Sequence, residues 1–292
     1  MSLSPLTQTL GPSPTLSLRQ RVGKLQRSGR SIENMSVGEP DLPLHPEIQE
    51  AAIRAIREQQ NGYTAVPGQA SLRQALAQQL SQRSGTPVTP DQVLYSAGAK
   101  QCLAQALMCL VHPGDEVIVL APLWPSYLDQ IALAKGKPVV VQTMQEQGYT
   151  PSIAQIEQAI SPRTRCILLN SPNNPTGAVY PASLLKDIAK LVQKHDIWLI
   201  SDEIYEHYIY PPTTTISVLK LDPLPPKTLY VSGFSKTYSM TGWRLGYMVG
   251  PPELITACAH LQGALTSGAC VISQWAGLAA LSLPQEFFTH LK

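Results

Sequence analysis

The sequence predicts an α/β protein, a three-layer sandwich in which helices cover both faces of a mostly parallel central sheet. From Gln92 onward, short aliphatic and β-branched runs alternate with longer stretches of helical periodicity. This alternation is typical of βαβ units, whose crossover helices fall on both faces of a sheet. The chain has 292 residues, of which 43% are hydrophobic and 14% charged, so a sizeable buried core is expected.

Charge, hydropathy and cysteine usage bear on which partners and which cellular location to expect. A formal net charge of +2 gives no argument for a nucleic-acid or membrane-surface partner. No apolar run approaches the length of a membrane span, and the first fifteen residues do not read as a secretory signal. The five cysteines form no CxxC pair, which favours reduced thiols and a cytoplasmic location. The histidines show no metal-ligand spacing, so no metal site is expected.

Three helices are predicted before the alternating region. The first lies near Ser17–Ser28, after a poorly ordered arm. The second starts at Pro46 or Glu47, has an apolar stripe that includes Ile56, and is expected to end at Asn61-Gly62. The third runs from about Gln69 to Gln82.

Six strands follow from the apolar runs of the alternating region, at 93–95, 116–120, 138–141, 166–169, 197–200 and 229–231. Helices are expected between them, at 101–111, 125–134, 153–160 and 181–194, and a last one lies near 271–283. The proline-rich piece Pro211 to Pro226 reads as a surface loop.

Ligand-handling residues in parallel sheets gather just beyond the carboxyl ends of the strands. Four segments stand in that position, namely Gly98–Lys100, Asn170–Gly177, Asp202–Tyr205 and Ser232–Lys236. We therefore expect one site built from these four segments.

Lys236 is the candidate reactive group of this site. It follows the apolar run 229–231, and an apolar setting disfavours the ammonium form of lysine. A neutral amine is what a Schiff base to an aldehyde needs, and Arg244 supplies a fork of donors suited to a phosphate. Together they suggest pyridoxal phosphate. Taken alone, a surface lysine and arginine in a loop is the simpler interpretation.

Two further segments add polar groups. Gly98, Ala99 and Lys100 open a helix whose free backbone N–H groups suit a phosphate, although an ordinary small-residue turn explains the segment equally well. Asn174 lies in a stiff turn and is either a plain Asn-Pro turn residue or a donor to a phenolic oxygen.

Asp202 and Tyr205 are the last two candidate residues of the predicted site. A carboxylate at this strand end can hold a pyridine nitrogen protonated, and Tyr205 can donate to the ring oxygen. The alternative is an N-capping aspartate and a packing tyrosine.

In these segments the chain resembles the fold-type I pyridoxal-phosphate aminotransferases, class I/II, in the aspartate aminotransferase-like branch. The motifs that carry the resemblance are Gly-Glu-Pro-Asp (38–41), Ser-Pro-Asn-Asn-Pro-Thr-Gly (171–177), Ser-Asp-Glu-Ile-Tyr (201–205) and Ser-Lys-Thr-Tyr-Ser-Met-Thr-Gly-Trp-Arg-Leu-Gly-Tyr (235–247). The match runs from about Ser17 to the end of the chain.

The resemblance implies a role for each residue around the cofactor, pyridoxal 5'-phosphate. Lys236 would carry the cofactor and later move the substrate proton. Asp202 would pair with the ring nitrogen, and Tyr205 and Asn174 would hold the ring oxygen. Arg244, Ser235 and the backbone amides of Gly98, Ala99 and Lys100 would complete the cofactor site, with Arg244 and these amides on the phosphate.

The resemblance also implies the remaining contacts. Trp124 would stack on the cofactor ring, whereas otherwise it is a loop aromatic in the core. Gly38 would line the substrate site together with Trp124 and Asn174. Tyr63 would reach the phosphate of the neighbouring subunit, so a homodimer is expected.

The expected domains are an N-terminal arm with part of a small domain (1–45) and a large cofactor-binding domain (46–292). Family members continue by roughly a small domain, on the order of 100 residues, which carries the arginine for the substrate carboxylate. We therefore expect a fragment or truncated form. The stretch Leu42-Pro43-Leu44-His45 also departs from the family's usual continuation after Gly-Glu-Pro-Asp.

The function expected from the resemblance is ping-pong transfer of an amino group between an amino acid and a 2-oxo acid, with aspartate and 2-oxoglutarate as a candidate pair. A β-lyase or decarboxylase on the same fold is an alternative. A non-catalytic fragment that binds the cofactor or dimerises is another. A nucleotide-binding α/β protein is disfavoured, because no Gly-x-Gly-x-x-Gly follows a strand.

Overall fold

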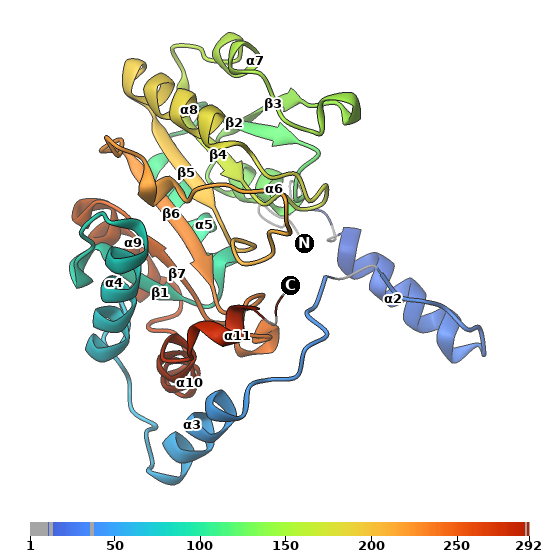
Figure 1. Ribbon diagram of the computed structural model, residues 1–292, viewed down its shortest axis with the longest axis vertical. Coiled ribbons are helices and arrows are strands. Elements are labelled where there is room, and N and C mark those ends of the chain that lie inside the picture. Colours follow the sequence, from blue (N-terminus) through green and yellow to red (C-terminus); the bar gives the residue numbers. More distant parts are fainter. Residues whose placement is uncertain (1–10, 12–13, 36–37, 290, 292) are drawn as a thin grey trace, which may run out of the picture.

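The computed structural model describes residues 11, 14–35, 38–289 and 291, and its centre is a seven-stranded sheet (Figure 1). The strand order is β1-β7-β6-β5-β4-β2-β3. The strands are β1 (Val93–Ser96), β2 (Glu116–Ala121), β3 (Lys137–Gln142), β4 (Thr164–Asn170), β5 (Trp198–Asp202), β6 (Thr228–Gly233) and β7 (Gly246–Val249). The five strands from β6 to β3 pair in parallel, as the sequence predicted.

Strand β7 is the exception, because it runs antiparallel to both of its neighbours, β1 and β6. The six predicted strands are present, but β7 was not predicted. It has only four residues and begins with a glycine inside a motif-rich loop, so its β-signal is weak. Because β1 and β6 are both antiparallel to β7, they point the same way. The carboxyl end of β1 therefore lies at the same sheet edge as those of the parallel strands.

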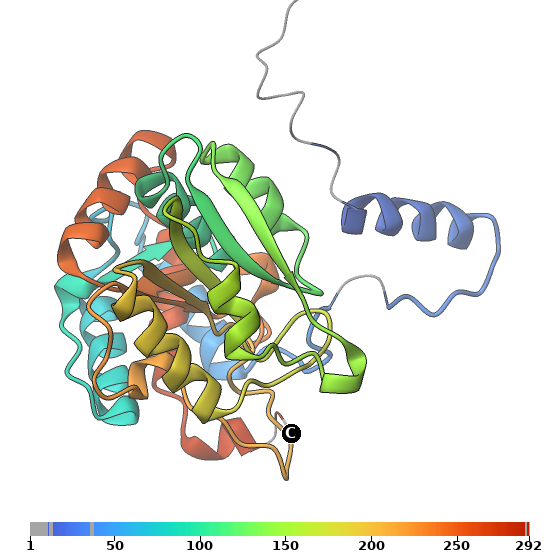
Figure 2. The same ribbon diagram turned by 90° about the horizontal axis from the view of Figure 1, so that it is seen from above.

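Helices cover both faces of the sheet, which confirms the predicted three layers (Figures 1 and 2). One face packs against α3 (Pro46–Arg57), α4 (Ala70–Ser84), α7 (Ile153–Gln158), α8 (Ala182–Lys194) and α10 (Val271–Leu281). The other packs against α5 (Ala99–Leu110), α6 (Ser126–Leu133) and α9 (Pro252–Leu265). Helix α9 was not predicted from the sequence.

Alternation along the strands divides the core into these two layers. In β2, Ile118 and Leu120 belong to the cluster beneath α4 and α8, whereas Val117 and Val119 belong to the cluster beneath α5 and α6. Successive side chains of a strand point to opposite faces, so a run of aliphatic residues fills both layers.

Helix α3 corrects two expectations from the sequence. It ends at Arg57, before Asn61-Gly62, because Gln59 already adopts a left-handed conformation with φ 58°. Ile56 is 55% exposed and is not part of the buried stripe. The buried face is formed by Ile48, Ala51, Ala52 and Ala55, and the small side chains of the three alanines allow α3 to lie close against α10.

The segment Pro211 to Pro226 is not only a surface loop. It contains a 3-10 turn, η3 (Val218–Lys220), in which Val218 and Leu219 are buried in the core. The apolar residues of this segment lie among five prolines and show neither strand nor helix periodicity, so the contact could not be predicted.

Helix α2 (Pro14–Arg27) stands apart from the sheet and its covering helices (Figure 2). It matches the helix predicted near Ser17–Ser28. Much of the arm predicted before it lies outside the described residues. The short helix α11 (Gln285–Thr289) follows α10. Within the described part of the chain, no helix has the length and apolar character of a membrane span.

Candidate active site

The carboxyl ends of β4, β5 and β6 meet at one edge of the sheet. Asn170 at the end of β4 is in register with Asp202 at the end of β5, and Asp202 is in register with Val231 of β6. A cavity of about 680 Å³ lies at this edge. Ten of the twelve predicted site residues line it: Gly38, Ala99, Lys100, Trp124, Asn174, Asp202, Tyr205, Ser235, Lys236 and Arg244.

Asp202 is the buried carboxylate of the cavity, with 3% of its surface exposed. Burial raises its pKa to about 6, although hydrogen bonds from Tyr127 and from the backbone of Ile204 favour the charged form and limit the rise. Tyr127 Oη donates to Oδ2 at 2.7 Å, and the Ile204 N–H donates to Oδ1 at 3.2 Å. The carboxylate is therefore fixed in position and ionised at neutral pH.

Asn174 and Tyr205 form a pair beside Asp202. The Asn174 amide Nδ2 donates to Tyr205 Oη at 3.3 Å. The backbone of Asn174 is tied to the strand ends by Asn170, whose Oδ1 accepts from Asn174 N at 2.8 Å and whose Nδ2 donates to Asp202 O at 3.0 Å. Burial and the Asp202 charge raise the pKa of Tyr205 to about 12, so its hydroxyl is a donor at neutral pH.

Lys236 reaches into the same cavity from the loop after β6. Its Nζ donates to the backbone oxygen of Gly38 and lies 5.9 Å from the centre of the Tyr205 ring. Burial lowers the pKa of Lys236, the nearby Arg244 charge lowers it further, and Glu39 opposes both. A lowered pKa enlarges the neutral fraction of the amine, which is the nucleophilic form.

The start of α5 and Arg244 form the end of the cavity where the sequence predicted a phosphate. Gly98 precedes the helix with φ 89°, and the first N–H groups of α5 have no partner within the helix. Arg244 Nη1 donates to Thr241 O at 2.9 Å and Nη2 donates to Ala97 O at 3.1 Å. An anion at this position would face the positive helix end and a guanidinium held by two backbone carbonyls.

Glycines allow close packing at this end of the cavity. A Cβ on Gly98 would lie 2.6 Å from Arg244 Nη2, and a Cβ on Gly246 would lie 2.2 Å from Ala99 N. The absence of side chains at these positions lets β7 and Arg244 approach the backbone of the α5 start.

Trp124 and Lys100 form a wall of the cavity. Lys100 Nζ lies 5.0 Å from the centre of the Trp124 ring, and the Trp124 and Tyr127 rings meet edge-on at 5.3 Å. The predicted stacking of Trp124 on a cofactor ring stays a prediction, but the indole lines the cavity.

Comparison with known proteins agrees with this geometry. The sequence profile of the family described as aminotransferase class I and II matches residues 30–292. The chain is 42% identical over 285 residues to an aspartate aminotransferase of Pinus pinaster, and 40% identical over 280 residues to an aspartate/prephenate aminotransferase of Thermus thermophilus. These alignments cover 97% and 96% of this chain, and 58% and 72% of the relatives.

The solved structure of aspartate aminotransferase from Thermus thermophilus with maleate is similar over 99% of this chain and 75% of its own, at 39% identity and a TM-score of 0.94. The chain belongs to the class I and II aminotransferases. It spans 58% of the length of the Pinus pinaster relative and 59% of that of a Petunia hybrida bifunctional aspartate and glutamate/aspartate-prephenate aminotransferase.

Aminotransferases of this family use pyridoxal 5'-phosphate, and the residues of the cavity fit it. The phosphate fits the α5 start, where the first backbone N–H groups of the helix and the Arg244 guanidinium lie together. Asp202 is a buried carboxylate suited to a ring nitrogen, and Tyr205 and Asn174 are donors suited to a ring oxygen. Lys236 is an amine of lowered pKa within reach of the same space.

Tyr63 does not line this cavity, and its predicted contact with the phosphate of a neighbouring subunit stays a prediction. Its side chain is 99% exposed and lies in the loop after α3, away from the cavity lining. Gly98 does not line the cavity either, but its neighbours Ala99 and Lys100 do.

Sequence reasoning named no role for three residues of the site, although Asn170 lies in the predicted segment 170–177. Tyr127 bonds Asp202, Asn170 ties Asn174 to β5, and Tyr208 Oη donates to Lys236 O at 2.8 Å. Asn170 and Tyr208 stand next to the recognised motifs, and their position could have suggested them. Tyr127 comes from α6, and no local pattern signals its contact with a residue 75 positions away.

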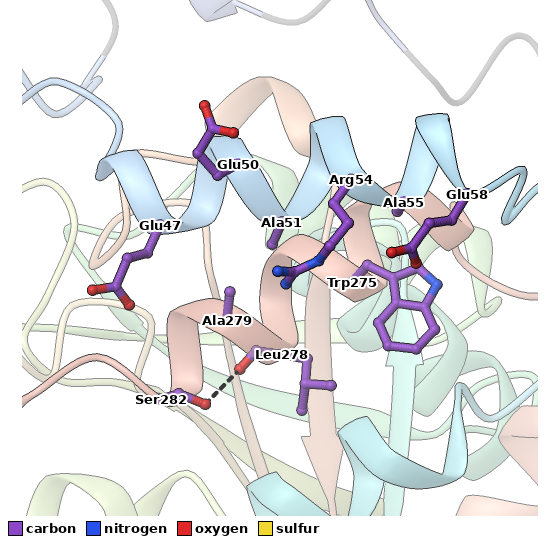
Figure 3. A pocket seen from close by; sticks show the side chains of 10 residues that line it. All are labelled: Glu47, Glu50, Ala51, Arg54, Ala55, Glu58, Trp275, Leu278, Ala279 and Ser282. Carbon is purple, nitrogen blue, oxygen red and sulfur yellow. Dashed lines mark hydrogen bonds between the residues drawn. The ribbon is translucent and has the colours of Figure 1, made fainter.

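A second hollow lies between α3 and α10 and is separate from this site (Figure 3). Glu47, Glu50 and Arg54 project from α3, Glu58 follows its last residue, and Trp275 lies opposite on α10. None of the predicted site residues lines it, so it is a groove between two packed helices rather than part of the cofactor site. Among the described residues, no group of three metal-ligating side chains is present.

Proposed function

We propose that this chain transfers an amino group between an amino acid and a 2-oxo acid, using pyridoxal 5'-phosphate held in the cavity at the sheet edge. The observation that carries the proposal is the convergence of Lys236, Asp202 and the α5 start on one cavity. The names of the relatives, aspartate and aspartate/prephenate aminotransferases, support aspartate as an amino donor.

The bound cofactor supplies an electrophilic aldehyde and a ring that withdraws electrons from the substrate Cα. Lys236 contributes the amine that attaches the cofactor and, once freed by substrate, is the base that moves the Cα proton. Its lowered pKa suits both roles, because each needs the neutral amine at neutral pH. The bond from Tyr208 to the Lys236 backbone keeps the side chain directed into the cavity.

Asp202 maintains the protonated ring nitrogen because its ionised carboxylate lies in a water-poor setting, where charge pairing is strong. Tyr205 and Asn174 orient the ring by donating to its oxygen. Arg244 and the α5 start anchor the phosphate and so fix the distance between the cofactor and Lys236. These roles are part of the proposal.

The proposed assembly is a homodimer in which Tyr63 reaches the phosphate of the partner subunit. Support comes from its exposure and from the hollow beside it, which is lined by residues 61–64 and 268–271. We also propose that residues 46–292 form the large domain and that residues up to 45 contribute to a small one. Free cysteines support a cytoplasmic location.

The test is borohydride reduction of the protein expressed with pyridoxal phosphate, followed by peptide mass analysis. We expect one cofactor per chain on Lys236, lost in Lys236→Ala. The matched control, Lys227→Ala, removes a lysine that pairs with Asp196 on the surface and leaves the adduct intact. An unmodified wild-type Lys236 would refute the proposal.

Amino transfer is tested by incubation with aspartate and 2-oxoglutarate. We expect glutamate to form without release of ammonia or CO₂. Ammonia or CO₂ as the main product would favour the lyase or decarboxylase alternative. A Lys236 adduct without any turnover would favour a non-catalytic cofactor-binding fragment.

A further inference from the structure

The Tyr63 side chain is not held in place by contacts of its own ring among the described residues. The ring is 99% exposed and makes no hydrogen bond or ring contact within the described part of the chain. Its direction therefore depends on the backbone of residues 61–69, which is irregular. Whatever fixes this backbone also fixes where the Tyr63 hydroxyl can go.

Gln274 of α10 holds the loop in place through hydrogen bonds. Its side chain is fully buried. Its Oε1 accepts from the backbone N–H of Gln69 at 2.7 Å. Its Nε2 donates to Thr64 Oγ1 at 3.1 Å and to Ala269 O at 2.7 Å. One buried amide thus joins both ends of the Tyr63 loop to the loop before α10.

The second loop is pressed against the first at the same place. A Cβ on Gly268 would lie 2.7 Å from Thr64 Oγ1, and a Cβ on Gly68 would lie 2.9 Å from the Tyr95 ring and 3.4 Å from Gln274 Oε1. Gly268 therefore lies close against Thr64, and Gly68 lies close against Tyr95 of β1 and against Gln274. The Gln274 amide bonds both loops at this contact.

Gln262 of α9 provides an independent anchor in the middle of the loop. Its Nε2 donates to Val66 O at 2.9 Å and to Tyr95 O at 2.8 Å, and Tyr95 N donates to Pro67 O at 2.9 Å. These bonds keep residues 66–67 on the sheet when Gln274 is altered. Loss of Gln274 is then expected to release the Thr64 end of the loop, next to Tyr63, without unfolding the whole segment.

We infer that Gln274 is a positioning residue that acts across the subunit interface: it holds the Tyr63 loop so that the Tyr63 hydroxyl meets the cofactor phosphate of the partner subunit. The inference rests on the proposed homodimer. In that dimer, Gln274 of one subunit helps to set the cofactor affinity of the other. Gln274 itself lies outside the lining of its own subunit's cavity.

The first test is a double-mutant cycle read out as the dissociation constant of pyridoxal 5'-phosphate. Tyr63→Phe and Gln274→Leu are each expected to raise it about tenfold, and the double variant no more than Tyr63→Phe alone. Gln274→Glu keeps the acceptor for Gln69 and is expected to fall between wild type and Gln274→Leu. Ser81→Ala, which frees a different loop by removing the acceptor of Val88 N, is the control and leaves the constant unchanged.

The second test mixes Gln274→Leu chains with Lys236→Ala chains. In a mixed dimer, only the Gln274→Leu chain can hold the cofactor covalently, and its partner supplies an intact Tyr63 loop. We expect that chain to regain wild-type affinity, measured as borohydride-fixed cofactor on Lys236 against cofactor concentration.

Different failures have different meanings. If Lys236 takes up the cofactor but Tyr63→Phe leaves the dissociation constant unchanged, the proposed Tyr63 contact is wrong. The inference about Gln274 is then wrong as well. If Tyr63→Phe weakens binding, but Gln274→Leu adds to it fully or is not rescued in the mixed dimer, only the role of Gln274 is overturned.

Discussion

The hydroxyl of Tyr127 donates a hydrogen bond of 2.7 Å to Asp202 Oδ2. The bond joins α6 to the end of β5 and lies wholly inside the protein, since both side chains are buried. A buried carboxylate is held in its charged form by such donors, so Tyr127 helps to keep Asp202 ionised.

Tyr127→Phe is expected to raise the pKa of Asp202 above its present value of about 6. A hydrogen bond to a charged group contributes about 1.5–3 kcal/mol, which corresponds to about one to two pH units. Cofactor binding needs the carboxylate, so affinity falls as the pH drops through this pKa, and in the variant the fall begins at higher pH. Titration with pyridoxal phosphate between about pH 5.5 and about pH 8.5 measures the shift.

The control for this variant is Tyr95→Phe, which removes another buried hydroxyl, one that donates to Leu72 O. Its affinity profile should keep the wild-type midpoint. A Tyr127→Phe profile that coincides with wild type would mean that Tyr127 does not set the charge of Asp202.

Asp202→Asn is expected to raise the stability of the cofactor-free protein and to lower its affinity for the cofactor. Because burial raises the folded-state pKa from 3.8 to about 6, the folded protein holds the Asp202 proton more tightly than the unfolded chain. Its contribution to the free energy of unfolding is therefore lost as pH rises between these two values, by roughly 2–3 kcal/mol. Asparagine carries no such loss, so the cofactor-free variant should gain stability relative to wild type over this range, while cofactor affinity falls.

Urea unfolding of the cofactor-free proteins at several pH values between the two pKa values measures this difference. Glu203, whose pKa burial raises to about 7, titrates in both proteins and cancels from the comparison. A difference that stays constant with pH would contradict the assigned cause.

The features that the sequence could predict are those with a local signal. The strand before Lys236 is an apolar run, and the turn at Asn174 is a dense Asn-Pro motif, so both were placed correctly in the chain. The carboxyl-end rule then predicted that they meet, because parallel strands share an edge.

The features that escaped prediction depend on tertiary contacts. Tyr127 reaches Asp202 only because α5 and α6 pack on the same sheet face. Strand β7 is short and is fixed by its two antiparallel neighbours rather than by its own residues. Ile56 fits a helical stripe, yet α10 covers only the alanine side of α3.

Gly246→Ala tests the phosphate end of the site. Its Cβ would lie 2.2 Å from Ala99 N, and a backbone atom cannot yield as a flexible side chain would. We expect the start of α5 to shift and the affinity for pyridoxal 5'-phosphate to fall at least about tenfold, equivalent to about 1.4 kcal/mol. Affinity for pyridoxal, which lacks the phosphate, should change little.

Gly242→Ala is the matched control, because no atom lies within 4 Å of its added Cβ. It should bind both compounds as wild type does. Melting temperature and circular dichroism establish that the Gly246→Ala protein is folded. Equal losses for pyridoxal and its phosphate would show that the substitution damages the site as a whole and not the phosphate end.

Glu39→Gln tests the electrostatics of Lys236. Burial and Arg244 lower the pKa of Lys236, and Glu39 is the charge that opposes them. Removing the Glu39 charge should lower this pKa further, enlarge the neutral fraction of the amine at neutral pH, and accelerate covalent attachment of added pyridoxal phosphate. Glu39 is exposed, and exposed ion pairs contribute about 0.2–1 kcal/mol, so the acceleration should not exceed about fivefold.

Asp41→Asn, two residues along the same loop, is the control, because Asp41 is not among the charges that shift Lys236. The attachment rate, followed by absorbance across pH, should rise for Glu39→Gln only below the pKa of Lys236 and converge with wild type above it. At high pH the amine is neutral in both proteins, so the charge at position 39 no longer matters there. A Glu39→Gln rate that is slower at neutral pH would show that Glu39 promotes attachment by orienting Lys236 through Gly38, and not by changing its charge.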